Sequence, residues 1–147
     1  MFIAGVGANL EIDFKKIIAF STLSQLGIII LILSLGKMEL AFFHLLIHAL
    51  FKSILFLCAG LVIHTFSGIQ DIRYLGRFFR FSPLISGCIG LRRLSLFGFP
   101  FVGGFYSKDL ILEFIYININ NIFVIIIVIV RTSLTIIYCI RMIYYIV

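Results

Sequence analysis

Charged residues are scarce in this sequence, and their scarcity argues against a soluble globular domain. They make up 12% of the 147 residues, whereas hydrophobic residues make up 63%. Soluble domains average about 25% charged and about 45–50% apolar residues. The mean hydropathy of +1.24 leaves too little polar sequence to cover a surface that faces water. The relevant unit is therefore the stretch of about 20 apolar residues that crosses the hydrocarbon of a bilayer.

The sequence has few cysteines, and its first residues lack the pattern of a secretory leader. Cys58, Cys88 and Cys139 each lie in an apolar stretch, where a cysteine acts as a small hydrophobic residue rather than a disulfide partner. The opening MFIAGVGANLE has neither a basic segment nor a cleavage site of small residues. We therefore expect no redox role for the cysteines, and membrane insertion that relies on the apolar stretches themselves.

Four apolar stretches predict a helical membrane protein. They cover residues 17–35, 40–63, 83–106 and about 122–145. Polar connections at 36–39, 64–82 and 107–121 separate them. The predicted fold is all-α, a polytopic bundle of about four transmembrane helices.

Positive charge gathers on one side of this predicted bundle. Lys15 and Lys16 precede the first stretch, and Arg73, Arg77 and Arg80 follow the second. Two crossings return the chain to its starting side, so both groups face one compartment, which the positive-inside rule identifies as the cytoplasm or a mitochondrial matrix. A nucleic-acid-binding protein would instead expose a basic face on a soluble fold. We therefore expect no nucleic-acid partner.

His44, His48 and Lys52 interrupt the second stretch at intervals of four residues. Each step of four advances about 40° around a helix, so the three side chains share one stripe that climbs about 12 Å. Lys52 stands near the middle of the stretch, where a charge costs about 2.5–3.5 kcal/mol on insertion scales and is usually retained for a function. Histidine gains and loses protons near neutral pH. The stripe therefore indicates a path for protons.

Two other interpretations of this stripe stay open. The histidines could form hydrogen bonds to neighbouring helices, while Lys52 extends to the interface or pairs structurally. The spacing of His44 and His48 also occurs in metal sites, but no further Cys, Asp or Glu stands close by in the sequence to complete the shell. We therefore expect no metal ion.

The third stretch contains FGFPFVGGF at 97–105, which predicts a broken helix. Pro100 removes one backbone hydrogen bond, and the glycines weaken the rest of the helix. Broken helices persist at membrane depth where protein or water satisfies the freed backbone, and ion-coupled transporters use them at their sites. Lys108 and Asp109 stand just beyond the break, and Glu113 follows one turn later. A simple kink with a charged interfacial end is the alternative.

Five segments carry a resemblance to a known family. They are DFKKIIAFSTLSQLG (13–27), AFFHLLIHALFKSILFLCAGLVIH (41–64), QDIRYLG (70–76), FGFPFVGGFYSKDLILE (97–113) and TSLTIIYCIRMIYY (132–145). In order and spacing they resemble the chain 5 family of mitochondrial NADH–ubiquinone oxidoreductase, an antiporter-like membrane subunit of respiratory complex I with Mrp-type antiporter relatives. The resemblance covers nearly the whole chain.

The resemblance implies that residues 1–147 form part of a proton-translocating antiporter-like domain. The residues at His44, His48 and Lys52 would belong to a central hydrophilic axis, and Lys108 would end the proton route. Asp109 and Glu113 are possible auxiliary residues. An earlier helix with a glutamate and a second broken helix with a lysine have no match here, so the chain resembles only a middle-to-late section of a longer subunit.

The resemblance also implies partners and a location. The chain would hold no cofactor, because NADH, FMN, iron–sulfur clusters and ubiquinone belong to other subunits. Its partners would be the other membrane-arm subunits and the lipid bilayer, as a multi-pass protein of the mitochondrial inner membrane. It would act as an enzyme only within the proton-translocating NADH:ubiquinone reductase. Two alternatives stay open: an Mrp-type cation/proton antiporter subunit, and a non-functional truncated translation product.

Some arginines contradict the membrane interpretation. Arg92 and Arg93 stand in the middle of the third stretch, where two charges would cost about 5–7 kcal/mol on insertion scales. The resemblance implies small neutral residues there. Many invertebrate mitochondria read AGA and AGG as serine, so translation by the nuclear code would write arginine instead. The same change at Arg77, Arg80 and Arg131 brings the sequence closer to the family pattern, and loss of all five charges lowers the formal charge from +6 to +1.

The lack of tryptophan fits the same hypothesis. The nuclear code reads TGA as a stop, which also truncates a frame, and it reads ATA as isoleucine rather than methionine. The sequence has no Trp, and 29 Ile stand against 3 Met. As an alternative, Arg93 would pair with a carboxylate on a missing helix, and an A+T-rich genome would enrich isoleucine. The nucleotide sequence distinguishes the two.

Overall fold

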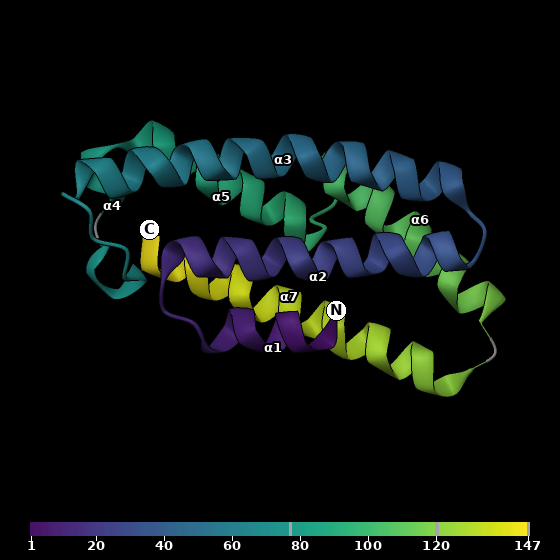
Figure 1. Ribbon diagram of the computed structural model, residues 1–147. Coiled ribbons are helices and arrows are strands. Elements are labelled where there is room, and N and C mark those ends of the chain that lie inside the picture. The colour runs from purple at the N-terminus through teal and green to yellow at the C-terminus, as the bar shows by residue number, and fades with distance from the viewer. Residues whose placement is uncertain (77, 120, 147) are drawn as a thin grey trace.

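The computed structural model describes residues 1–76, 78–119 and 121–146 as a succession of helices with short connections (Figure 1). They are α1 (Phe2–Leu10), α2 (Phe14–Ser34), α3 (Met38–Thr65), the 3₁₀ turn η1 (Ile72–Tyr74), α4 (Phe78–Phe81), α5 (Pro83–Phe97), α6 (Gly103–Asn118) and α7 (Ile122–Ile146). Apart from an isolated bridge between Asp13 and Asp71, these ranges contain no strand. The all-α prediction is confirmed.

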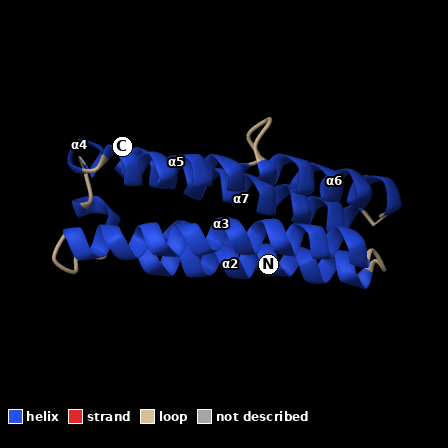
Figure 2. Cartoon of the chain, turned by 90° about the horizontal axis from the view of Figure 1, so that it is seen from above, coloured by secondary structure: helices blue, strands red, loops and turns tan. Residues whose placement is uncertain are grey.

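Four crossings alternate in direction along the bundle (Figure 1). The helices α2, α3 and α7 are each long and apolar enough to cross a membrane. The helices α5 and α6 have 15 and 16 residues, which gives lengths of only about 22 and 24 Å. They follow one another roughly end to end, and the loop between them stands out from the bundle (Figure 2). The predicted helical membrane bundle with a broken third segment is therefore confirmed, and three of its helices have membrane-spanning length.

The structure corrects the predicted connection at 107–121. The helix α6 continues to Asn118, because Ser107, Ile111 and Ile115 recur at helical spacing and are buried against the bundle. Asp109, Glu113 and Asn118 lie on the exposed face of the same helix, so they lowered the average hydropathy of the segment without ending the helix. The short helix α1 had no counterpart among the predicted stretches.

The two basic clusters lie at the same end of the bundle, as two crossings require. The Phe14 amide donates to the carbonyl of Gln70 at 2.8 Å, and the Ile72 amide donates to the carbonyl of Ile12 at 3.2 Å. These bonds join the start of α2, with Lys15 and Lys16, to the connection that holds Arg73 and Arg80. Arg77 lies outside the described residues.

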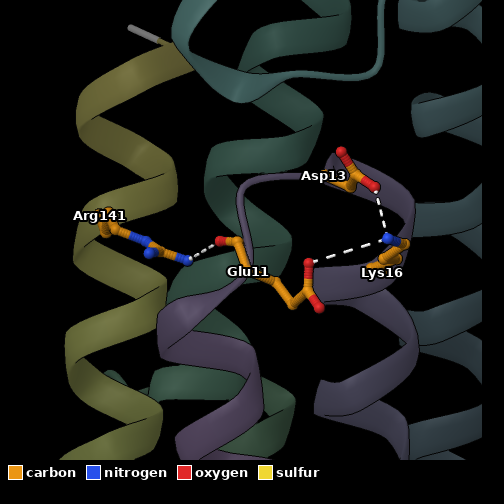
Figure 3. A network of polar contacts seen from close by, with 4 residues as sticks. All are labelled: Glu11, Asp13, Lys16 and Arg141. Carbon is orange, nitrogen blue, oxygen red and sulfur yellow. Dashed lines mark hydrogen bonds and ion pairs between the residues drawn. The ribbon is translucent and has the colours of Figure 1, made fainter.

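Glu11, Asp13 and Lys16 make the turn before α2 a charged network (Figure 3). The Lys16 ammonium lies 2.9 Å from an Asp13 carboxylate oxygen and 4.0 Å from a Glu11 carboxylate oxygen. Its hydrogen bond holds the pKa of the Asp13 carboxyl below the usual value. All three side chains are partly or largely exposed, so this network lies at the surface and adds little to stability.

Arg141 ties α7 to the end of α1. Its guanidinium donates to the carbonyl oxygens of Ala8 at 2.9 Å, of Glu11 at 2.8 Å and of Asn9. The contact with Glu11 is drawn in Figure 3. Carbonyls at the end of a helix lack partners within that helix and carry a partial negative charge. This half-buried guanidinium is thus stabilised by backbone oxygens that themselves need donors.

Two apolar clusters enclose a band of buried polar residues at the middle of the bundle. One cluster lies towards the basic end and includes Ile18 of α2, Leu55 of α3 and Tyr138 of α7. The other lies towards the opposite end, with Ile28 of α2 and Ala41 of α3 among its members. The buried polar residues of this band are Ser21, Ser24, Gln25, His44, His48, Lys52, Arg93, Ser95, Ser107, Lys108, Arg131 and Thr135. Polar side chains from different helices therefore meet at a similar depth.

Candidate functional site

The stripe on α3 faces the interior of the bundle. His44, His48 and Lys52 are only 6%, 8% and 4% exposed, and α3 packs there against α2, α5 and α6. The two imidazole rings stack with centroids 6.3 Å apart. Lys52 stands near the centre of the 28-residue helix α3. The four-residue spacing therefore places all three groups on one buried face, as predicted.

Lys52 is held by neutral oxygens of α2. Its ammonium donates to the carbonyl of Ile18 at 3.3 Å and to the hydroxyl of Ser21. Within the part of the chain that the structure describes, the ion pairs are those of Lys16, far from this site. A carboxylate would hold the lysine proton firmly, whereas a hydroxyl and a carbonyl stabilise the ammonium more weakly. The arrangement therefore suits a lysine that exchanges its proton.

The break in the third crossing is built by Gly98. Its φ of +89° is left-handed, a conformation that glycine adopts without strain. The amides of Gly98 and Phe99 both donate to the Leu94 carbonyl at 3.1 Å, which closes the end of α5. The chain then makes a short loop through Pro100 and re-enters a helix at Gly103. The residues singled out in the sequence thus form the predicted interruption.

Lys108 reaches back across this break. Its ammonium donates to the carbonyl of Phe97, the last residue of α5, at 2.9 Å. That carbonyl lies at the end of a helix, where a partial negative charge favours a cation. Lys108 is 6% exposed. Like Lys52, it is a buried lysine that a backbone oxygen holds, and in the described residues it has no carboxylate partner.

A small cavity lies between the two lysine-bearing helices. His44 Nδ1 lies 3.1 Å from the hydroxyl oxygen of Ser107, the residue before Lys108. A cavity of about 20 Å³ adjoins this contact and is lined in part by Gln25, His44, His48 and Lys108. That volume suffices for one water molecule. Gln25 Oε1 and the Nε2 atoms of both histidines have no hydrogen-bond partner among the described residues. Polar groups therefore extend from Lys52 through the histidines to Lys108.

The structure separates the six predicted site residues into two groups. His44, His48, Lys52 and Lys108 lie in the buried polar band, whereas Asp109 and Glu113 lie on the exposed face of α6. In the described ranges no three His, Cys, Asp or Glu side chains gather as metal ligands.

The sequence analysis missed the neutral polar residues around the stripe. Ser21, Gln25 and Ser107 supply the hydroxyl and amide groups of the site, and each is at most 2% exposed. Ser21 and Gln25 are four residues apart, so they share one helix face. That spacing was a usable signal for a polar face on α2.

Two buried arginines in the same band lack adequate partners. Arg93 and Arg131 are both 0% exposed. No nitrogen of the Arg93 guanidinium has a hydrogen-bond partner in the described residues, and Arg131 makes a single bond, to the Ser24 carbonyl at 3.3 Å. Arg92 is half-buried over the ring of Phe51, 5.0 Å from its centroid. A fully buried charge without a counter-ion or hydrogen bonds is strongly destabilising.

Gly104→Ala is expected to disturb the junction of α5 and α6. A Cβ added there would lie 2.9 Å from both the carbonyl carbon and the hydroxyl oxygen of Ser95, and nearer still to its carbonyl oxygen. A backbone segment must move to relieve such a contact, which costs about 1–3 kcal/mol. We expect a lower thermal midpoint for the full-length family member that carries this segment, measured in detergent. Gly60→Ala is the matched control, because its Cβ meets no atom within 4 Å; an equal loss there would contradict the explanation.

Comparison of the sequence with known proteins places this chain in a family. Residues 1–135 match the family model described as NADH:quinone oxidoreductase/Mrp antiporter, transmembrane. The chain is 52% identical over 145 residues to NADH-ubiquinone oxidoreductase chain 5 of Aedes aegypti, and 53% identical over 145 residues to that of Locusta migratoria. Each alignment covers 99% of this chain and 25% of the relative.

A vertebrate relative gives the same result at lower identity. The chain is 45% identical over 134 residues to NADH-ubiquinone oxidoreductase chain 5 of Mus musculus, which covers 91% of this chain and 22% of the relative. The chain thus spans about a quarter of the length of the curated relatives that it matches. With buried lysines on a continuous and on a broken helix, and a family model that matches most of its length, the chain belongs to the NADH:quinone oxidoreductase/Mrp antiporter family of membrane proteins.

Proposed function

We propose that this chain is a proton-translocating segment of complex I chain 5, which couples electron transfer from NADH to ubiquinone with proton pumping. The observation that carries the proposal is the pair of buried lysines, Lys52 on α3 and Lys108 beyond the break, with His44 and Ser107 in contact between their helices. The relatives that cover the chain are named for that complex. The proposed setting is the mitochondrial inner membrane, with other membrane-arm subunits as partners.

Proton transfer in this proposal follows the polar band. Lys52 holds a proton against the neutral oxygens of Ser21 and Ile18. The proton passes along His48 and His44 to the Ser107 side of α6, and from there to Lys108. Like charges repel more strongly in a low-dielectric interior than in water, so a proton arriving on Lys52 favours release from Lys108. A change of charge at one end of the band thereby drives a transfer at the other end.

Electron transfer takes place elsewhere in this proposal. NADH, FMN, the iron–sulfur clusters and ubiquinone are bound by other subunits, and this chain contributes only proton-holding side chains. The chain alone, at about a quarter of its relatives' length, is expected to be inactive. Its activity as an enzyme therefore exists only in the assembled NADH:ubiquinone reductase.

An NADH-driven pumping assay tests the function. Complex I that contains a full-length chain 5 with this segment is reconstituted into vesicles, and internal acidification is followed after NADH and a quinone are added. We expect acidification that depends on both substrates and does not require sodium.

The rival function is cation/proton antiport, because the matched family also includes Mrp antiporters. An antiporter would move protons in response to a sodium gradient without NADH. Sodium-driven proton movement in the absence of NADH, with no NADH-driven acidification, would overturn the proposal.

A further inference from the structure

The partner of Lys52 on α2 is a serine whose orientation is fixed. The Ser21 hydroxyl donates to the Ile18 carbonyl at 2.7 Å and accepts from the Lys52 ammonium. Because its hydrogen is committed to Ile18, its lone pairs face Lys52. Ser21 is 0% exposed and Lys52 is 4% exposed, so water does not compete freely for this bond. The serine is therefore a preset acceptor.

In the described residues, no carboxylate accepts a hydrogen bond from the Lys52 ammonium. The titratable groups that interact electrostatically with Lys52 are His48 on its own helix, Arg93 on α5 and Cys139 on α7. None of them is a carboxylate, and a guanidinium opposes the lysine charge. The charged lysine is therefore stabilised chiefly by the hydroxyl of Ser21 and the carbonyl of Ile18. Only the hydroxyl can be removed by substitution.

We propose that Ser21 is a positioning residue of the proton route, which holds Lys52 in its protonated state on the α2 side of the site. This inference rests on the proposed function of Lys52. A hydrogen bond from an ammonium is stronger than one from a neutral amine, so the contact favours the protonated lysine and weakens when the proton leaves. The lysine is then free to leave α2. Ser21 thus gives the transfer a defined starting position.

The test replaces Ser21 in a full-length chain 5 that carries this segment, assembled in complex I and reconstituted into vesicles. Ser21→Ala is expected to lower the initial rate of NADH-driven proton pumping by about tenfold to 100-fold, the range of one lost charge-assisted hydrogen bond. Ser21→Thr is expected to restore pumping, because its hydroxyl can form the same bond to the carbonyl of the preceding turn. NADH oxidation with an artificial acceptor, which needs no membrane arm, is expected to stay at the parental rate.

Further variants separate positioning from packing. Ser21→Cys fills a similar volume with a poor acceptor, so we expect it to pump as slowly as Ser21→Ala; parental pumping by the cysteine variant would overturn the proposal. Ser53→Ala and Ser86→Ala are matched controls. Each serine hydroxyl bonds to the carbonyl three residues before it, at 2.9 and 3.0 Å, and makes no bond to the Lys52 ammonium. A loss in either control as large as that of Ser21→Ala would also overturn the proposal.

Lys52→Ala separates the role of Ser21 from the proposed function of the chain. If Lys52→Ala stops pumping and Ser21→Ala does not change it, Ser21 has no positioning role while the proposed function stands. If neither substitution changes pumping in an assembled complex, the proposed function fails as well. Should Ser21→Ala prevent assembly, the threonine and cysteine variants decide: restored pumping by threonine and reduced pumping by cysteine support the proposal, and equal rates contradict it.

Discussion

Lys52→Ala and Lys108→Ala are each expected to reduce proton transfer through this segment by about 100-fold or more, the lower limit for loss of a positioned proton-transfer group. Alanine cannot carry a proton, and no other titratable side chain in the described residues occupies either position. Each variant is made in a full-length chain 5 that carries this segment. The measurement is the rate of vesicle acidification divided by the rate of NADH oxidation with quinone.

Assembly of the complex is expected to survive both lysine substitutions. Removing a buried charge that has no carboxylate partner relieves a cost of membrane burial, so these variants lose function without losing a stabilising ion pair. Lys37→Ala is the matched control, since Lys37 is exposed at the turn between α2 and α3, 5.5 Å from the centre of the Phe114 ring. Normal pumping by both buried-lysine variants in assembled complex would exclude these residues from the proton route.

The sequence predicted those features of the fold that depend on local pattern. Apolar stretches of membrane length predicted the helices α2, α3 and α7, and Pro100 with the neighbouring glycines predicted the break between α5 and α6. The four-residue spacing of His44, His48 and Lys52 predicted a single buried face. Each of these features follows from helix periodicity or backbone sterics, both of which depend only on residues that are close in the sequence.

Tertiary partners could not be predicted in the same way. Ser21 meets Lys52 only because α2 packs on α3 at a particular rotation, and Ser107 meets His44 only because α6 begins at Gly103. The sequence also suggested the charges of Asp109 and Glu113 as site residues, although both project away from the buried face of α6.

Arg93→Ser and Arg131→Ser are expected to stabilise the protein, each by about 2.5–3.5 kcal/mol on membrane-insertion scales. The structure distinguishes among the arginines that, by the sequence hypothesis, replace serine. Arg80 is exposed and needs no partner, whereas Arg93 and Arg131 are fully buried in the band with orphaned nitrogens. The measurement is the thermal midpoint of full-length chain 5 carrying this segment, in detergent, with arginine or serine at these positions.

Arg141→Ser is the control for that comparison, and it is expected to have the opposite effect. This arginine donates to three backbone carbonyls at the end of α1, so its removal leaves acceptors unsatisfied at a cost of about 1–3 kcal/mol. Replacing an arginine that has hydrogen-bond partners is thus expected to lower stability, whereas replacing one that lacks them is expected to raise it. Equal destabilisation by all three substitutions would show that Arg93 and Arg131 also have partners in the full-length protein.

The residues at 93 and 131 of the natural polypeptide are therefore expected to be serine. A serine hydroxyl at position 93 or 131 can donate to a carbonyl of its own helix, as Ser21, Ser24 and Ser133 do. Its hydrogen-bonding requirement is then met without another helix, whereas a buried guanidinium needs partners from elsewhere. Mass spectrometry of peptides from the mitochondrial membranes of the source determines these residues directly, and AGA or AGG codons would agree with serine. Peptides with arginine at 93 and 131, or CGN codons there, would contradict the expectation, and the two guanidinium groups would then require carboxylates from the three quarters of chain 5 that lie outside this segment.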